Sequence, residues 1–112
     1  MKVTVKERTF DLECTCRMHI IYEEKRNATA DPTDRSLTTM MYLLYACILG
    51  SAEKQKIKLQ FSEDEFKNWL DDSGYLSIIS EFSTWLNDQI AAQYDRLGKI
   101  ETDEEEPKKV KD

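Results

Sequence analysis

The chain has 112 residues, of which 34% are charged and 40% hydrophobic, and its formal net charge is −6. This length and composition are typical of one soluble globular domain with a charged surface. The acidic balance argues against nucleic acid as a partner, because nucleic-acid affinity comes from neutralising phosphates, and against an anionic membrane surface. Three cysteines and no recognisable signal peptide indicate reduced thiols and a cytoplasmic protein.

Residues 2–12 alternate in polarity. Val3 and Val5 alternate with polar neighbours, and Phe10 and Leu12 repeat the pattern after Glu7-Arg8. This spacing predicts two short β-strands joined by a tight turn, although the turn lacks the Asn-Gly or Asp-Gly pair that is typical of hairpins.

Two helices are predicted next. The first runs from Thr15 to Arg26, has one apolar face, and ends in acidic and basic residues. Residues 27–32 are predicted to form a loop. The second begins between Thr33 and Ser36 and is expected to end at Gly50. Its residues 40–49 form an uncharged apolar segment that is too short to span a membrane. Such a segment indicates a helix that lies at the centre of a core or is partly covered by another chain.

The second half of the chain favours two more helices. Residues 51–60 are ambiguous between a polar helix end and an extended link. Ser62 and Glu65 form a Ser-x-x-Glu capping box that opens a short helix ending near Asp71-Asp72. A long apolar stripe then predicts a helix from Tyr75 to Leu97, about 35 Å in length, whose far end overhangs the core or meets another subunit.

The predicted fold is therefore α+β and mostly helical, with an N-terminal β-hairpin packed against about four helices. Residues 1–98 form a single globular domain. Residues 99–112 form a disordered, acidic, charged C-terminal tail, because only Ile100 and Val110 could bury apolar surface there.

The sequence contains no recognisable motif for metal binding or catalysis. Cys14, Cys16 and His19 lack the number and spacing of ligands that a zinc site needs, so no metal and no cofactor is predicted. Cys16 and His19 stand three residues apart on a helix, but no oxyanion site accompanies them. We expect a protein that is not an enzyme and has no catalytic residues.

Large aromatic residues divide into two groups. Phe66, Phe82 and Tyr94 lie on apolar stripes and are assigned to the core. The candidates for contact with a partner lie on or near stripe edges, since Trp and Tyr are enriched at protein interfaces. These candidates are Tyr42, Tyr45, Trp69 and Trp85.

The order of these elements resembles the tail assembly chaperones of long-tailed bacteriophages and prophages. The resemblance covers residues 2–97 and rests on Tyr22-Glu23-Glu24-Lys25, Asp31-Pro32, the apolar segment Leu43 to Ala46, and the Ser-x-x-Glu-Phe segment that leads into Trp-Leu-Asp between Ser62 and Asp71. The chain lacks the glycine often expected in the hairpin turn and after the first helix.

The resemblance implies a non-enzymatic role in virion morphogenesis in the host cytoplasm. Such proteins bind the tape measure protein, promote polymerisation of tail tube subunits around it, and are absent from the finished particle. Many also have a longer, frameshifted product. A homo-oligomer remains open, as does an alternative function: a small acidic phage protein that inhibits a host nucleic-acid-binding protein by charge mimicry.

Overall fold

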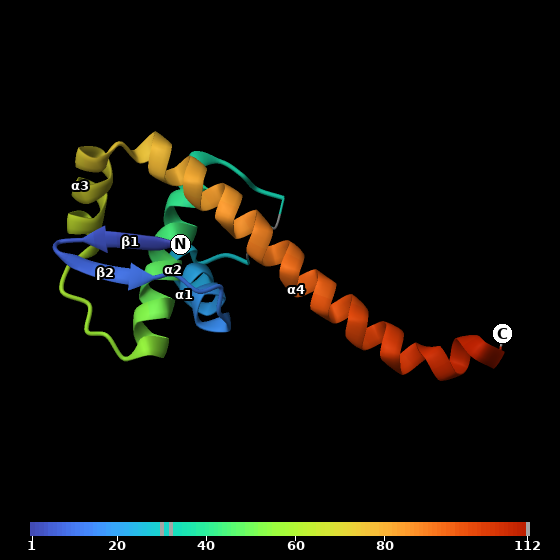
Figure 1. Ribbon diagram of the computed structural model, residues 1–112. Coiled ribbons are helices and arrows are strands. Elements are labelled where there is room, and N and C mark those ends of the chain that lie inside the picture. Colours follow the sequence, from blue (N-terminus) through green and yellow to red (C-terminus); the bar gives the residue numbers. More distant parts are fainter. Residues whose placement is uncertain (30, 32, 112) are drawn as a thin grey trace.

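The described residues form a hairpin and four helices (Figure 1). The structure is a computed structural model that describes the backbone of residues 1–29, 31 and 33–111, and the side chains of these residues up to Leu97. The elements in chain order are β1 (Lys2–Val5), β2 (Arg8–Asp11), α1 (Cys16–Arg26), α2 (Leu37–Gln55), α3 (Glu63–Ser73) and α4 (Tyr75–Lys111). The predicted α+β, mostly helical fold with an N-terminal hairpin is confirmed.

The hairpin forms as its alternating pattern predicts. β1 and β2 pair antiparallel, with Val3 opposite Phe10 and Val5 opposite Arg8. Val3, Val5 and Phe10 are buried, so one face of the two strands closes the core. Lys6 and Glu7 form the turn with φ angles of 51° and 69°. This is the left-handed backbone that Asn and Gly adopt more easily, so the hairpin forms without the usual turn residues.

Helix α2 is the centre of the domain. Ser36 caps its start, where the serine side chain accepts a hydrogen bond from the backbone N–H of Thr39. Residues 44–48 are all at least 95% buried. α1 packs along α2 most extensively, and β2 and α4 also contact it. Of the two surroundings predicted for this apolar helix, a place at the centre of the core is the one observed.

The predicted end of this helix at Gly50 is wrong, because α2 continues to Gln55. A Cβ atom at Gly50 would lie 2.8 Å from the backbone nitrogen of Met18 and 3.1 Å from Oγ1 of Thr15. The glycine therefore permits the close approach of α1 rather than terminating α2. After α2, residues 57–61 belong to neither a helix nor a strand, and Phe61 is buried.

The start of α3 confirms the predicted capping box. The Ser62 hydroxyl accepts a hydrogen bond from the Glu65 N–H at 3.2 Å, and the Glu65 carboxylate accepts one from the Ser62 N–H at 2.9 Å. Gly74, with φ of 81°, separates α3 from α4. α3 buries Phe66 and Leu70 and contacts the first part of α4.

Helix α4 leaves the domain, as Figure 1 shows. Ile79, Phe82 and Leu86 are buried, whereas Tyr94 and Leu97 are 66% and 49% exposed. The backbone extents of 59 × 30 × 26 Å reflect this projection. The predicted overhang is confirmed, but the assignment of Tyr94 to the core is wrong because the core ends one to two turns earlier. α4 does not end at Leu97 as predicted but continues to Lys111, and the expected disorder of residues 99–112 stays a prediction.

Candidate functional site

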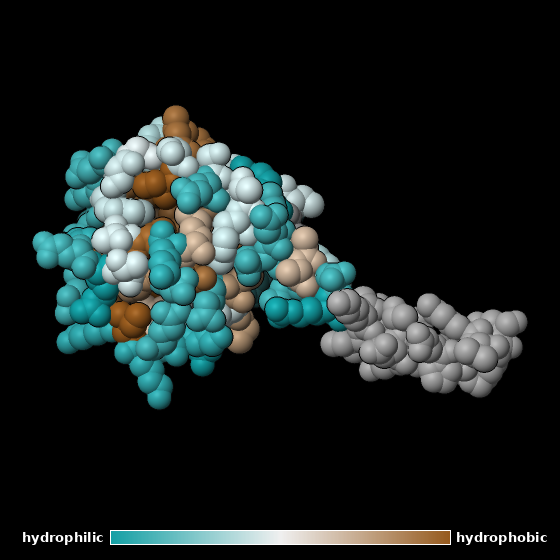
Figure 2. All heavy atoms as spheres, in the orientation of Figure 1, coloured by the Kyte–Doolittle hydropathy of each residue, from teal (hydrophilic) through white to brown (hydrophobic). Residues whose placement is uncertain are grey.

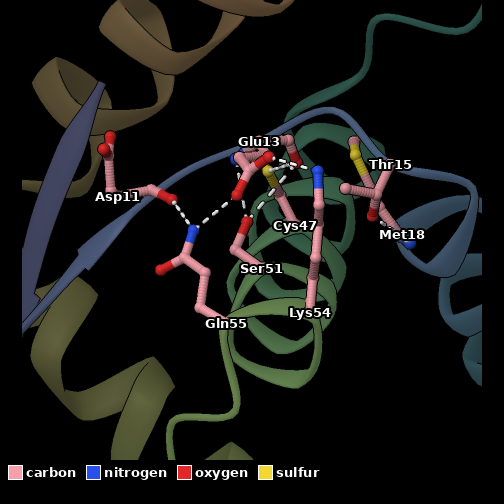
Figure 3. Close-up of polar contacts among 8 residues, drawn as sticks. All are labelled: Asp11, Glu13, Thr15, Met18, Cys47, Ser51, Lys54 and Gln55. Carbon is pink, nitrogen blue, oxygen red and sulfur yellow. Dashed lines mark hydrogen bonds and ion pairs between the residues drawn. The ribbon is translucent and has the colours of Figure 1, made fainter.

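The beginning of α1 is fastened to α2 by a polar cluster around Glu13 (Figure 3). The backbone N–H of Glu13 donates to Oγ of Ser51 at 2.8 Å, and the Cys47 thiol donates to the Glu13 carbonyl at 3.3 Å. The Glu13 carboxylate accepts hydrogen bonds from Lys54 and Gln55, each at 2.7 Å. These contacts join the link between β2 and α1 to the last two turns of α2.

The same cluster sets the protonation of two groups. Hydrogen bonds from Lys54 and then Gln55 lower the pKa of the Glu13 carboxyl. Burial raises the pKa of the Cys47 thiol to about 12. Cys47 is therefore a protonated hydrogen-bond donor within the core and cannot supply a thiolate near neutral pH.

The end of α1 is fastened to the start of α2 in a similar way. Arg26 donates to the hydroxyls of Tyr22 at 3.4 Å and Thr39 at 3.3 Å, and the Thr39 hydroxyl donates to the Asp34 carboxylate at 2.7 Å. Asp34 also accepts from the backbone N–H of Ser36 at 2.9 Å. The Ser36 backbone hydrogen bond, followed by the Thr39 hydroxyl, lowers the pKa of Asp34. Thus α1 is held at both of its ends.

Between this fixed helix and α4 lies a groove of about 530 Å³, which we call the α1–α4 groove. Its apolar lining comes from three helices that are distant in sequence. The apolar lining consists of the buried Met18, Tyr22 and Leu86, the half-buried Leu43 and Ile90, and the exposed Tyr94. Because α1 is fastened at both ends and α4 is held by its buried stripe, the groove is formed without any partner present.

Polar groups surround the apolar lining. Cys16, His19, Asp31, Arg35 and Gln93 line the groove and are exposed. The His19 Nε2 atom lies 3.2 Å from a carboxylate oxygen of Glu23. These side chains carry both signs of charge, so the groove has an apolar base and a mixed polar rim, as sites for small molecules and peptides commonly do.

The predicted contact aromatics separate into two places. Tyr45 packs on Phe66 with ring centroids 4.8 Å apart, and Phe66 packs on Trp69 at 5.9 Å. Tyr45 is only 5% exposed, and burial raises its pKa. Tyr45 is a core residue whose side chain has little exposed surface for a partner to contact, so we exclude it from the proposed contact surface. Trp69 is half-buried.

Tyr42 and Trp85 have different surroundings. Tyr42 is half-buried, with the Arg26 guanidinium 5.1 Å and the Lys67 ammonium 6.0 Å from its ring centroid. Trp85 packs on Phe82 at 5.8 Å and lines a pocket of about 670 Å³ whose other walls are mostly polar. The structure therefore does not bring the four predicted residues into one site, and none of them lines the α1–α4 groove.

From the sequence, the apolar residues that line the groove were assigned to the core, and Cys16 and His19 were considered only as a catalytic or metal site. The signal that could have found them is the length of the last helix. Its apolar stripe continues through Ile90, Tyr94 and Leu97, beyond the span that a domain of this size can cover. An apolar stripe that extends beyond the core of its own domain leaves an apolar surface that another molecule can bury.

Other features of the described residues bear on chemistry. Cys16 is exposed, Cys14 is half-buried with its pKa raised by burial, and no disulfide joins the three thiols. Within the part of the chain whose side chains are described, no three His, Cys, Asp or Glu residues gather as metal ligands would. None of the described helices combines the length and apolar character needed to cross a membrane.

Comparison of the chain with protein-family models, with curated proteins and with solved structures gave no match.

Proposed function

We propose that this protein is a non-enzymatic polypeptide-binding protein that takes an apolar helical segment of a client into the α1–α4 groove. The observation that carries the proposal is the groove itself, which has a volume of about 530 Å³ and an apolar base that continues onto the exposed Tyr94. Helix-in-groove recognition uses apolar anchors at helical spacing, and a groove between packed helices suits such anchors.

The identity that we propose is a bacteriophage or prophage tail assembly chaperone acting in the host cytoplasm. The support is the sequence resemblance over residues 2–97 together with a binding groove and a hydrophilic exterior. Figure 2 displays one face of the domain, where hydrophilic residues predominate and hydrophobic ones form separate patches. The proposed client is the tape measure protein, and the proposed effect is polymerisation of tail tube subunits around it.

The arrangement of acidic residues favours this function over charge mimicry. A nucleic-acid mimic needs an array of carboxylates that are free to meet a basic partner. Here the Glu63 carboxylate pairs with Lys25 and Lys67 at 3.3 Å, and Glu65 pairs with Lys6. Two further carboxylates, Glu13 and Asp34, accept hydrogen bonds in the two polar clusters at the ends of α1. These intramolecular pairs reduce the charge available for mimicry.

A co-purification experiment tests the proposed function. The tagged protein is co-expressed with the tape measure protein encoded in the same phage genome, and the soluble complex is quantified. Tyr94→Ser is expected to reduce the recovered client at least about tenfold, equivalent to about 1.4 kcal/mol of binding. Leu76→Ser is the matched control, since Leu76 is 58% exposed on the same helix but does not line the groove.

Cys16 provides a second measurement that needs no substitution. Its exposed thiol lines the groove, so a bound client should slow its reaction with a maleimide. Equal client recovery with both variants, and an unchanged Cys16 rate in the complex, would exclude the groove as the client site. Turnover of a small molecule that is abolished by Cys16→Ser would instead favour an enzyme.

A further inference from the structure

Two of the three thiols border the α1–α4 groove from one short segment at the start of α1. Cys14 and Cys16 both line the groove, and the first is half-buried while the second is exposed. The hydroxyl of Thr15 between them is directed at α2 instead, because its Oγ1 atom lies 3.1 Å from the position of a Cβ atom at Gly50. Successive side chains of an extended backbone alternate, so Cys14 and Cys16 share the side that borders the groove.

The third thiol is withdrawn from the groove. Cys47 is fully buried, and its thiol donates a hydrogen bond to the Glu13 carbonyl at 3.3 Å (Figure 3). Burial also raises the pKa of Cys47 to about 12, which keeps this thiol protonated. Cys14 and Cys16 therefore form the pair of thiols that a small reagent can reach from the groove, and one residue separates them.

We propose that Cys14 and Cys16 form a redox-sensitive site, which hydrogen peroxide converts to an intramolecular disulfide. The Cys16 thiolate attacks one oxygen of the peroxide, the O–O bond breaks, and the departing hydroxide takes up a proton, which leaves a sulfenic acid on Cys16 and one water. The Cys14 thiolate then attacks this sulfur, the S–O bond breaks, and a second water leaves. Overall the two thiols lose two electrons and two protons, and the peroxide is reduced to two waters.

Exposure sets the order of the two steps. Cys16 is exposed and meets the oxidant first. Burial raises the pKa of the Cys14 thiol, so a smaller fraction of Cys14 is ionised near neutral pH. Because the thiolate is the nucleophile, the attack of Cys14 on the oxidised Cys16 is the slower step, and its rate should rise with pH.

Closing the bridge requires the start of α1 to change shape. Two residues of extended chain span about 6.6–7.2 Å, whereas the Cα atoms of a disulfide are usually about 4.4–6.8 Å apart. Thr15 has φ of −120° and ψ of 162°, and it must leave this extended conformation before the two sulfurs can meet. Its hydroxyl accepts a hydrogen bond from the Met18 N–H at 3.1 Å and caps α1, so oxidation should remove the cap.

The strain that this movement introduces makes the bridge reversible. A disulfide that forces the backbone out of its preferred geometry is reduced more easily than a relaxed one. The pair should therefore stay reduced in the presence of a thiol reductant and close only when peroxide is present. Oxidation thus changes both the lining of the groove and the first turn of the helix that forms one of its walls.

One consequence rests on the function proposed above. Because both thiols line the proposed client site, the bridge should lower client recovery at least about threefold, and dithiothreitol should restore it. The bridge itself is measured on the purified chain without a client. A chain that forms the bridge but binds no client would contradict only the proposed function, and a chain that binds a client but forms no bridge would contradict only this inference.

Mass spectrometry of the purified full-length chain after treatment with hydrogen peroxide tests the bridge. Trypsin cleaves after Lys and Arg, so Cys14 and Cys16 fall in one peptide, residues 9–17, and Cys47 falls in another, residues 36–54. Peptide 9–17 should lose the mass of two hydrogen atoms, and dithiothreitol should reverse the loss. The melting temperature of the oxidised chain should fall by roughly 4–8 °C, as expected when a helix loses its cap.

Two variants identify the partners. Cys47→Ser should form the bridge like the wild type, because a serine hydroxyl can donate to the same Glu13 carbonyl and the proposed pair is unchanged. Cys14→Ser should stop at the sulfenic acid of Cys16, which dimedone labels. Circular dichroism of both reduced variants should show the helical content of the wild type.

Three results would overturn the proposal, and all three are read on the wild type, which needs no substitution. The first is a disulfide that joins peptide 9–17 to peptide 36–54, and the second is a disulfide between two chains. The third is a Cys16 that is oxidised to the sulfinic acid while Cys14 remains a thiol. A bridge within peptide 9–17 that leaves the melting temperature unchanged would contradict the coupling to the cap of α1.

Discussion

Helix α4 contains two regions with the same sequence pattern and opposite surroundings. Ile79, Phe82 and Leu86 are at most 4% exposed, whereas Tyr94 and Leu97, about two and three turns beyond Leu86 on the same stripe, are at least 49% exposed. The difference shows that an apolar stripe specifies a helix face but does not specify what covers it. α2 and α3 cover the first region, and we propose that other polypeptides cover the second.

The comparison would be tested most strongly by removing one aromatic ring from each region. Phe82→Ala should lower the free energy of unfolding by about 3–5 kcal/mol, because it deletes a fully buried ring and leaves a cavity. Tyr94→Ala should change it by less than about 0.5 kcal/mol, because the ring is mostly in water. Urea denaturation followed by circular dichroism at low protein concentration measures both values. Similar losses in the two variants would mean that the exposed region belongs to the core.

A smaller effect is expected where α1 meets α2. Gly50→Ala places a Cβ atom 2.8 Å from the backbone nitrogen of Met18, so α1 must move away from α2. We expect a net loss of about 1–3 kcal/mol in spite of alanine's better helix propensity. Ser80→Ala, at an exposed position of α4, is the control and should be neutral or slightly stabilising. A Gly50→Ala protein as stable as the wild type would show that the α1–α2 contact is not tight.

A pH titration distinguishes the polar contacts of the packed region from the exposed end of α4. The pKa of Asp34 is lowered in the folded protein, so the ionised carboxylate stabilises the fold. This contribution is complete above the unfolded pKa of about 4 and is lost as the pH falls through the folded value. The difference in melting temperature between wild type and Asp34→Asn should therefore be largest near neutral pH and should vanish in acid.

Tyr94→Ala is the control for that titration, because it removes an exposed ring and no carboxylate. Its melting temperature should follow the wild-type pH dependence throughout. An Asp34→Asn difference that persists unchanged below pH 4 would show that the carboxylate does not act through its charge. It would also weaken the case for a rigidly held α1, because Asp34 connects the start of α2 to Arg26 through Thr39.

Local chemistry made several elements predictable. The capping box of Ser62 and Glu65, the alternation in residues 2–12 and the apolar segment 40–49 each depend on neighbours within a few positions. Such local patterns can be recognised from the sequence without knowing which distant residues pack against them. The prediction at Gly50 was wrong for the opposite reason. A glycine that ends a helix and a glycine that admits a neighbouring helix look the same until the neighbour is in place.

The candidate site was not predictable in the same way. Met18, Leu43 and Ile90 read as ordinary core positions, and their grouping into one groove depends on how α1 and α4 approach α2. The aromatic residues chosen for interface preference were instead separated by packing. Tyr45 was buried against Phe66, and Trp85 lies in a different pocket.

By itself the sequence determined the fold class, the start of each helix, the hairpin, and the presence of an apolar stripe longer than its domain. It did so because hydrogen bonding and periodicity act over short distances along the chain. Only the tertiary structure decided where the stripe ceases to be core and which helices border the groove. Burial depends on residues that are distant in sequence, and the fastened ends of α1 fix where those residues lie.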